Sequence, residues 1–203
     1  MEQIKNRRRK IAIVSASIAA IAVIIILILL LIKKNATSAP TIWINTPGKV
    51  SISGDREFTI DVSISELTED VLFPASSVSV SFDKSRLEFL GMEEGNIFIL
   101  SDNGFDLPSW SVNVENSNKT GLINVMYLDE TAGRYAFSSK GFDEVDRNIL
   151  IRFKFRLRGS VIRGDIMDFV IQDAVMAAVD STQSLATQNN TLKAVEGRIA
   201  ADD

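Results

Sequence analysis

Residues 151–158 read IRFKFRLR, a stretch in which apolar and basic side chains alternate at every position. Successive side chains of a β-strand point to opposite faces, so this alternation predicts a strand with one buried and one solvent-exposed face. Residues 58–64 and 78–82 alternate in the same way, with Thr, Asp and Ser at the polar positions. The sequence therefore predicts a set of half-buried strands.

The rest of the chain after residue 40 favours the same all-β class. Further apolar segments that can form strands are residues 41–45, 49–52, 122–128, 166–171 and 193–199. Turns rich in Gly, Pro, Asn and Asp separate these segments. Only residues 173–180, DAVMAAVD, predict a short helix. Many short strands separated by turns predict a β-sandwich.

The N-terminal part of the chain has a different character. Residues 11–32, IAIVSASIAAIAVIIILILLLI, contain no charged residue, no proline and no glycine. A helix of these 22 residues would be ~33 Å long, enough to cross the ~30 Å hydrocarbon core of a bilayer. Such a helix also pairs its own backbone polar groups, as lipid requires. We therefore expect one transmembrane helix over residues 11–32.

Basic residues are more numerous before this apolar run than after it. Residues 1–10 carry five basic side chains, whereas residues 33–40 carry Lys33 and Lys34. Because basic segments beside a membrane helix stay in the cytoplasm, we expect a cytoplasmic tail at residues 1–10 and a linker at residues 33–40. Residues 41–203 would then form an extracellular domain of a single-pass membrane protein. A cleaved signal peptide is the alternative, but its apolar region is shorter, about 7–15 residues.

Composition excludes several classes of function. Seven of the 22 basic residues and one of the 26 acidic residues precede Asn35, which leaves 15 basic and 25 acidic residues in the domain. A surface this acidic is a poor partner for nucleic acid. The chain has no Cys and no His, so it lacks disulfides and the commonest general base and metal ligand. We expect no enzymatic activity, no metal site and no cofactor.

Three groups of residues are candidates for binding or chemistry. Asp129 and Glu130 are adjacent carboxylates after a predicted strand, but adjacent residues of an extended chain point in opposite directions, which favours a surface loop. The basic residues of 151–158 could bind an anionic partner, although pairing with acidic residues of neighbouring strands is the expectation. The aromatic residues that could stack on sugars are Trp43, Trp110, Tyr127 and Tyr135, and packing explains each of them equally well.

The order of the motifs resembles that of cohesin domains. Residues 78–92, VSVSFDKSRLEFLGM, resemble the cohesin strand that leads into Tyr/Phe-Asp-Pro-x-x-Leu-Glu, with Lys84 in place of the proline. Residues 121–135, GLINVMYLDETAGRY, resemble a cohesin strand that ends in an acidic loop containing glycine. Residues 141–157 and 196–199 resemble the segments that follow. The resemblance spans essentially all of the predicted domain.

This resemblance implies a jelly-roll sandwich of about nine strands, of the kind shared with carbohydrate-binding modules. Cohesins bind dockerin modules, which carry the calcium of the pair, and so assemble polysaccharide-degrading complexes on scaffolds or cell surfaces. Cohesins of the first type place Asn and Asp on the strand before the Asp turn, where this chain has Ala75 and Ser77. The acidic loop is present as Asp129 and Glu130.

The resemblance also implies a surface for partners. The expected contact residues are Ser77, Ser79, Ser81, Tyr127, Asp129, Glu130 and Arg134. The expected partner is a dockerin-like protein module or a polysaccharide, in addition to the lipid bilayer around residues 11–32. The alternative is a carbohydrate-binding or purely structural surface domain that does not recognise dockerins. The small serine side chains favour this alternative, because interface hot spots are usually aromatic residues or Arg.

Overall fold

The computed structural model describes residues 39–54, 56–96, 110–130, 135–139 and 148–202. Contacts divide the chain into Met1–Ser38 and Ala39–Asp203, and the second unit is the one described below. The expected cytoplasmic tail, the membrane helix at residues 11–32 and the linker up to residue 38 lie outside the described residues. Within the described part, no helix is both long and apolar enough to cross a membrane.

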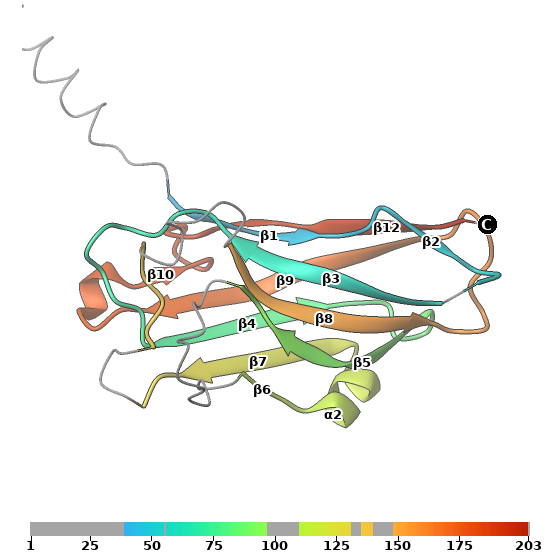
Figure 1. Cartoon of the computed structure of the whole chain (residues 1–203), viewed down its shortest axis with the longest axis horizontal. Coiled ribbons are helices and arrows are strands. Elements are labelled where there is room, and N and C mark those ends of the chain that lie inside the picture. Colours follow the sequence, from blue (N-terminus) through green and yellow to red (C-terminus); the bar gives the residue numbers. More distant parts are fainter. Residues whose placement is uncertain (1–38, 55, 97–109, 131–134, 140–147, 203) are drawn as a thin grey trace, which may run out of the picture. The chain divides into compact units, whose positions relative to one another are not determined.

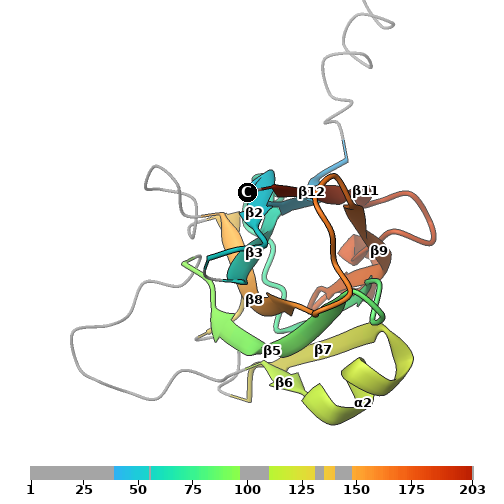
Figure 2. The same cartoon turned by 90° about the vertical axis from the view of Figure 1, so that its right-hand side faces the viewer.

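The domain consists of two packed β-sheets (Figures 1 and 2). The first sheet contains, in spatial order, β11 (Lys193–Val195), β1 (Thr41–Asn45), β3 (Glu57–Ile64), β8 (Ile149–Leu157) and β5 (Leu87–Glu94). The second contains β2 (Lys49–Ser51), β12 (Gly197–Asp202), β9 (Ile166–Ala177), β4 (Ala75–Ser81), β7 (Leu122–Leu128) and β6 (Ser111–Val112), with β10 (Leu185–Ala186) paired to β9. The predicted β-sandwich is confirmed.

The described residues form twelve strands where about nine were expected. Strands β6 and β10, which were not predicted, have only two residues each, too few to show alternation in a sequence. Residues 193–199, predicted as one strand, contribute to both sheets, because β11 pairs with β1 and β12 pairs with β9. The chain changes sheets next to Gly197, where a Cβ atom would lie 2.5 Å from Ile44 Cγ2. Glycine is therefore required by close approach at this crossing.

The core lies between the sheets and is built on the alternation that the sequence shows. In β8, Ile151, Phe153, Phe155 and Leu157 are at most 2% exposed. Phe155 is the centre of an aromatic cluster, with ring centroids 5.1 Å from Phe169, 5.2 Å from Phe82 and 5.5 Å from Phe89. The burial predicted for this strand is confirmed.

The predicted helix at residues 173–180 is wrong, because most of this segment belongs to β9. Ala174 and Met176 are each 1% exposed, while Asp173 and Val175 are half-buried, so the burial has a period of two. The segment pairs with β4 on one side and with β10 on the other. Alanine has the highest helix propensity, but such propensities amount to less than about 1 kcal/mol per residue, and pairing with two strands overrides them.

The α-helix of the described domain, α2 (Val114–Thr120), was not predicted. The Asn113 side chain accepts a hydrogen bond from the Asn116 N–H at its start, and Gly121, with φ of 76°, ends it. Asn118 in this helix pairs with the free edge of β5. Its Nδ2 donates to the Phe89 carbonyl at 2.8 Å and its Oδ1 accepts from the Phe89 N–H at 2.9 Å. The helix thus closes a sheet edge that would otherwise be open to other chains.

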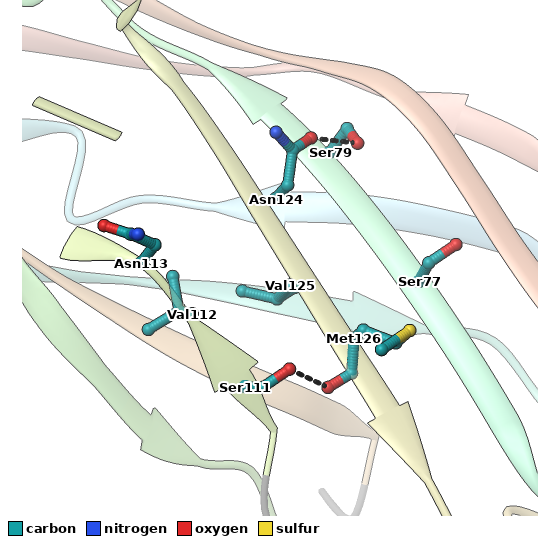
Figure 3. A pocket seen from close by; sticks show the side chains of 8 residues that line it. All are labelled: Ser77, Ser79, Ser111, Val112, Asn113, Asn124, Val125 and Met126. Atoms are coloured by element: carbon teal, nitrogen blue, oxygen red, sulfur yellow. Dashed lines mark hydrogen bonds between the residues drawn. The ribbon is translucent and has the colours of Figure 1, made fainter. Parts of the chain in front are cut away.

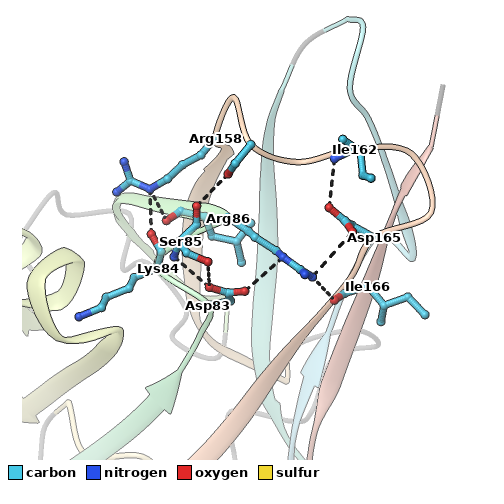
Figure 4. A network of polar contacts seen from close by, with 10 residues as sticks. Asp83, Lys84, Ser85, Arg86, Arg158, Ile162, Asp165 and Ile166 are labelled. Atoms are coloured by element: carbon cyan, nitrogen blue, oxygen red, sulfur yellow. Dashed lines mark hydrogen bonds and ion pairs between the residues drawn. The ribbon is translucent and has the colours of Figure 1, made fainter.

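The turn between β4 and β5 joins the two sheets through polar contacts (Figure 4). Asp83 Oδ1 accepts from the Ser85 N–H at 2.9 Å and from the Ser85 hydroxyl at 2.5 Å. The Ser85 hydroxyl, opposed by partial burial, holds the pKa of Asp83 below its ordinary value. Arg86 then contacts both Asp83, at 3.4 Å, and the carbonyl of Ile166 on β9, at 3.2 Å. In this turn, residues of the cohesin-like motif, Asp83 and Arg86, connect the two sheets.

Candidate binding face

Strand β4 lies in the middle of the outer surface of the second sheet. Ser77, Ser79 and Ser81 point outward, and Val78 and Val80 point into the core, where they are 1% and 0% exposed. The orientation predicted from the alternation is therefore confirmed. Because β4 is flanked by β7 and β9, the serines lie at the centre of a surface formed by β9, β4, β7 and β6. We call this surface the serine face.

Two large apolar side chains lie beside these serines on β7. Met126 is opposite Ser77 and is 59% exposed, and Leu128 is opposite Ala75 and is 52% exposed. Sequence analysis predicted the strand but did not assign these two residues to a site. The alternation within residues 122–128 was the available signal, because it places the even-numbered positions on the outer face.

The expectation that Tyr127 contacts a partner is wrong, because Tyr127 points to the core and is 0% exposed. Its hydroxyl donates to the Tyr135 carbonyl at 2.6 Å. Its ring centroid lies 4.7 Å from that of Phe137 and 5.5 Å from that of Trp110. Burial, with a smaller contribution from the charge of Asp129, raises the pKa of Tyr127 well above its ordinary value. Tyr127 therefore supports the serine face from below.

The two adjacent carboxylates point in opposite directions, as the sequence predicted. Asp129 is only 7% exposed, and its N–H donates to the Pro74 carbonyl at 2.7 Å, whereas Glu130 is exposed. Glu130 therefore remains a candidate contact, but Asp129 does not in this conformation. Arg134 lies outside the described residues. Among the residues that the structure describes, no group of Asp, Glu, His or Cys side chains is placed to hold a metal ion.

An open hollow of about 450 Å³ lies on the serine face over β7 (Figure 3). The Ser79 hydroxyl donates to Asn124 Oδ1 at 2.7 Å at one side, and the Ser111 hydroxyl donates to the Met126 carbonyl at 3.3 Å at the other. The residues lining the hollow are Ser77, Ser79, Ser111, Val112, Asn113, Asn124, Val125 and Met126. All of them are uncharged, so the hollow offers apolar contact together with hydroxyl and amide groups.

Further exposed apolar residues lie where β4 starts and β9 ends. Leu72 is 42% exposed and Val179 is 74% exposed. The Val179 N–H donates to the Leu72 carbonyl at 3.1 Å, so the two residues are neighbours. They lie beyond the same end of the sheet as Leu128, because Ala75 at the start of β4 pairs with both Leu128 and Ala177.

The basic residues of β8 lie on the outer surface of the other sheet and are mostly paired across strands. Arg152 Nε lies 3.3 Å from Asp61, and Arg156 Nε donates to Glu57 at 3.1 Å. Lys154 pairs with Glu93. The expectation of cross-strand pairing is confirmed for these three residues, so they are engaged by the domain's own acids.

None of the four aromatic residues considered as sugar platforms is fully exposed. Trp110 is 2% exposed and Tyr127 is 0% exposed, and both belong to the core. Trp43 and Tyr135 are half-buried. Stacking on a sugar ring needs an open aromatic face, so the four residues do not favour a carbohydrate site.

Comparison with known proteins identifies the fold. No protein-family model matches the sequence, and no curated protein matches it. Among solved structures, a chain of Coh-OlpA–Doc918, a type I cohesin–dockerin complex from Clostridium thermocellum, is 20% identical with a TM-score of 0.58, covering 80% of this chain and 99% of that chain.

Two further structures agree with that match. The third cohesin of ScaC from Acetivibrio cellulolyticus, solved in complex with the ScaB dockerin, is 11% identical with a TM-score of 0.56, covering 81% of this chain and 99% of that chain. A cohesin module from a family 33 glycoside hydrolase of Clostridium perfringens is 10% identical with a TM-score of 0.55, covering 82% of this chain and 98% of that chain. The domain therefore has the fold of cohesin modules.

Proposed function

We propose that this protein is a non-catalytic binding module that docks a dockerin-like protein module on its serine face. The observation that carries the proposal is the exposure of Met126 and Leu128, at 59% and 52%, beside the outward serines of β4. Large apolar side chains on a rigid sheet, flanked by hydroxyl and amide groups, are typical of a protein interface. The fold shared with cohesin modules supports the same class of partner.

Two kinds of residue on the serine face would contribute to binding in different ways. Met126 and Leu128 would supply buried apolar area, the component that the serines lack. Ser77, Ser79, Ser81 and the exposed Glu130 would donate or accept hydrogen bonds around them. Hydrogen bonds at a wet rim contribute less than those in a desolvated centre, so we expect most of the affinity to come from the two apolar residues.

We further propose that the domain is displayed on the outside of the cell membrane and acts there in polysaccharide degradation. The apolar run at residues 11–32 and the basic residues before it support this location. Protease added to intact cells that express the full chain should then digest the domain. A soluble mature form that begins near Pro40 would contradict the anchor.

The docking proposal is tested by substituting exposed apolar residues inside and outside the serine face. Met126→Asp and Leu128→Asp in the full chain should each weaken binding to a panel of dockerin modules by tenfold or more. Ile162→Asp is the matched control, because Ile162 is 66% exposed and lies in the loop before β9. Binding should also be lost when a chelator removes calcium, since the dockerin partner would carry the ion.

Two results would contradict docking on this face. The first is an equal loss of binding in all three variants, Met126→Asp, Leu128→Asp and Ile162→Asp. The other is binding of a polysaccharide that depends on Trp43 and ignores the chelator. That second result would make a carbohydrate-binding surface domain the better description.

A further inference from the structure

Most of the described basic side chains are paired with carboxylates. Those without an ion pair are Arg56, Lys84, Arg158 and Lys193. The domain has 25 acidic and 15 basic residues, so a basic side chain without a carboxylate partner is the exception here. Where such residues gather, a counter-charge from another molecule is the expected complement.

Three of these four residues lie together at one end of the sandwich. Arg158 Nε donates to the carbonyl oxygens of Lys84, at 2.9 Å, and Leu87, at 3.0 Å. Arg56 Nη2 donates to the Arg158 carbonyl at 2.5 Å. We call Arg56, Lys84 and Arg158 the cationic end. It belongs to the end of the domain that faces the viewer in Figure 2, where β8 stops and β3 begins.

Strand register explains why Arg158 has no carboxylate partner. The basic residues of β8 before it meet acids on β3 and β5. Arg158 instead lies beside Arg86, whose carbonyl accepts from the Arg158 N–H at 2.7 Å. The nearby carboxylates of Asp83 and Asp165 are engaged by Arg86, at 3.4 and 4.0 Å. In Figure 4 the contacts of the Arg158 guanidinium start at Nε, and its two terminal nitrogens project away from the network.

Arg56 adds an independent observation. Its Nε is buried and has no hydrogen-bond partner in the described structure. Buried donors in folded proteins nearly always have an acceptor. The Arg56 guanidinium thus has one N–H on the Arg158 carbonyl and a buried Nε–H that lacks an acceptor, which indicates a position where an acceptor is missing.

We infer that the cationic end binds an oxyanion, a carboxylate or phosphate group of a molecule other than the docking partner. A guanidinium presents parallel N–H donors that match two oxygens of either group. Lys84 adds a third positive charge, and its Nζ donates to the Lys119 carbonyl. Because Arg56 and Arg158 adjoin β3 and β8 of the other sheet, the site is separate from the serine face and does not rest on the proposed docking.

Nuclear magnetic resonance of the arginine Nε–H groups tests this inference directly. The full chain is titrated with sodium acetate and, separately, with inorganic phosphate, at constant ionic strength set by chloride. The Nε–H signals of Arg56 and Arg158 should shift and reach saturation, and the tighter probe identifies the group that the natural ligand carries. The Nε–H signal of Arg152, paired with Asp61, should not follow the same curve.

Substitutions then distinguish binding at a specific site from non-specific electrostatic attraction of the anion to the domain. Arg158→Gln should weaken the tighter probe by about tenfold or more, the loss expected for a charge-assisted hydrogen-bond pair. Lys84→Gln should weaken binding of the same probe several-fold, and this variant replaces Arg158→Gln in the test if Arg158→Gln does not fold. Arg152→Gln should leave probe binding unchanged. Shifts that do not saturate with either probe, or an equal loss in Arg152→Gln, would overturn the inference.

Asp55 provides a last check, because it precedes Arg56 and lies outside the described residues. Asp55→Asn should leave probe binding intact or make it tighter. Binding seen only in Asp55→Asn would mean that the chain neutralises its own arginines, and the inference would fail.

Discussion

Replacing Tyr127 with Phe removes one hydroxyl from the core beneath the serine face. The ring can keep its contacts with Phe137 and Trp110, at centroid distances of 4.7 and 5.5 Å. The variant loses the 2.6 Å hydrogen bond to the Tyr135 carbonyl. Because the group lost is buried and its acceptor loses this donor, we expect Tyr127→Phe to lower the free energy of unfolding by about 1–3 kcal/mol.

Urea unfolding followed by tryptophan fluorescence measures this change, since Trp110 packs against Tyr127. In a domain of this size, each 1 kcal/mol corresponds to a shift of roughly 2–4 °C in melting temperature. Tyr127→Ala is the reference for losing the whole ring and should cost about 3–5 kcal/mol. An unfolding free energy unchanged in Tyr127→Phe would mean that the hydroxyl is solvated and that Tyr127 is not a core residue.

The same variant has a distinct dependence on pH. The folded pKa of Tyr127 is raised above the ordinary value of 10.0, chiefly by burial. The unfolded state therefore releases this proton first, and the folded state loses stability as pH rises above about 10. Wild-type protein should lose more stability between pH 9 and 11 than Tyr127→Phe does. Parallel losses in the two proteins would contradict the burial of this hydroxyl.

Three further substitutions test contacts elsewhere in the fold. Asp83→Asn should reduce the loss of stability in acid. The pKa of Asp83 in the folded state is lowered, mainly by Ser85, so the contribution of this carboxylate to stability is present above pH 3.8 and is lost as the pH falls below that value. Urea unfolding at pH 6 and pH 3 measures the difference. Asn118→Asp should cost about 2 kcal/mol, since it removes the amide donor to the Phe89 carbonyl and places a carboxylate beside it; an unchanged unfolding midpoint would show that the edge of β5 needs no partner. Gly197→Ala should cost about 1–3 kcal/mol by overpacking, and a stabilised variant in thermal unfolding would mean that the sheets can separate there.

The sequence predicted the parts of this fold that rest on local alternation. Long strands such as β8 have apolar residues at every second position, and these residues are buried as the alternation predicted. Strand β9 was partly mistaken for a helix because alanines at residues 174, 177 and 178 weaken the contrast between its two faces. Helix α2 carries few apolar residues, since its sequence is VENSNKT, and it is held by caps and by Asn118.

In the candidate site too, the features that depend on one strand were predictable and those that depend on distant strands were not. The outward direction of Ser77, Ser79 and Ser81 was predictable from one strand alone. Met126 and Leu128 were missed because an exposed apolar residue is recognised only when the buried face of its strand is known. Tyr127 was assigned to the surface by residue type, although the parity of its strand places it inside. The pairing that leaves Arg158 without an acid depends on β5, which is distant in sequence.

Methionine methyl resonances test the docking claim most directly. The full chain, labelled at its methionine methyl groups, is mixed with a dockerin module and calcium. We expect the signal of Met126, which is 59% exposed on the serine face, to shift on binding, whereas those of Met167 and Met176, each 1% exposed, keep their positions. Binding that leaves Met126 unchanged and shifts Met92, on β5 of the other sheet, would contradict docking on the serine face.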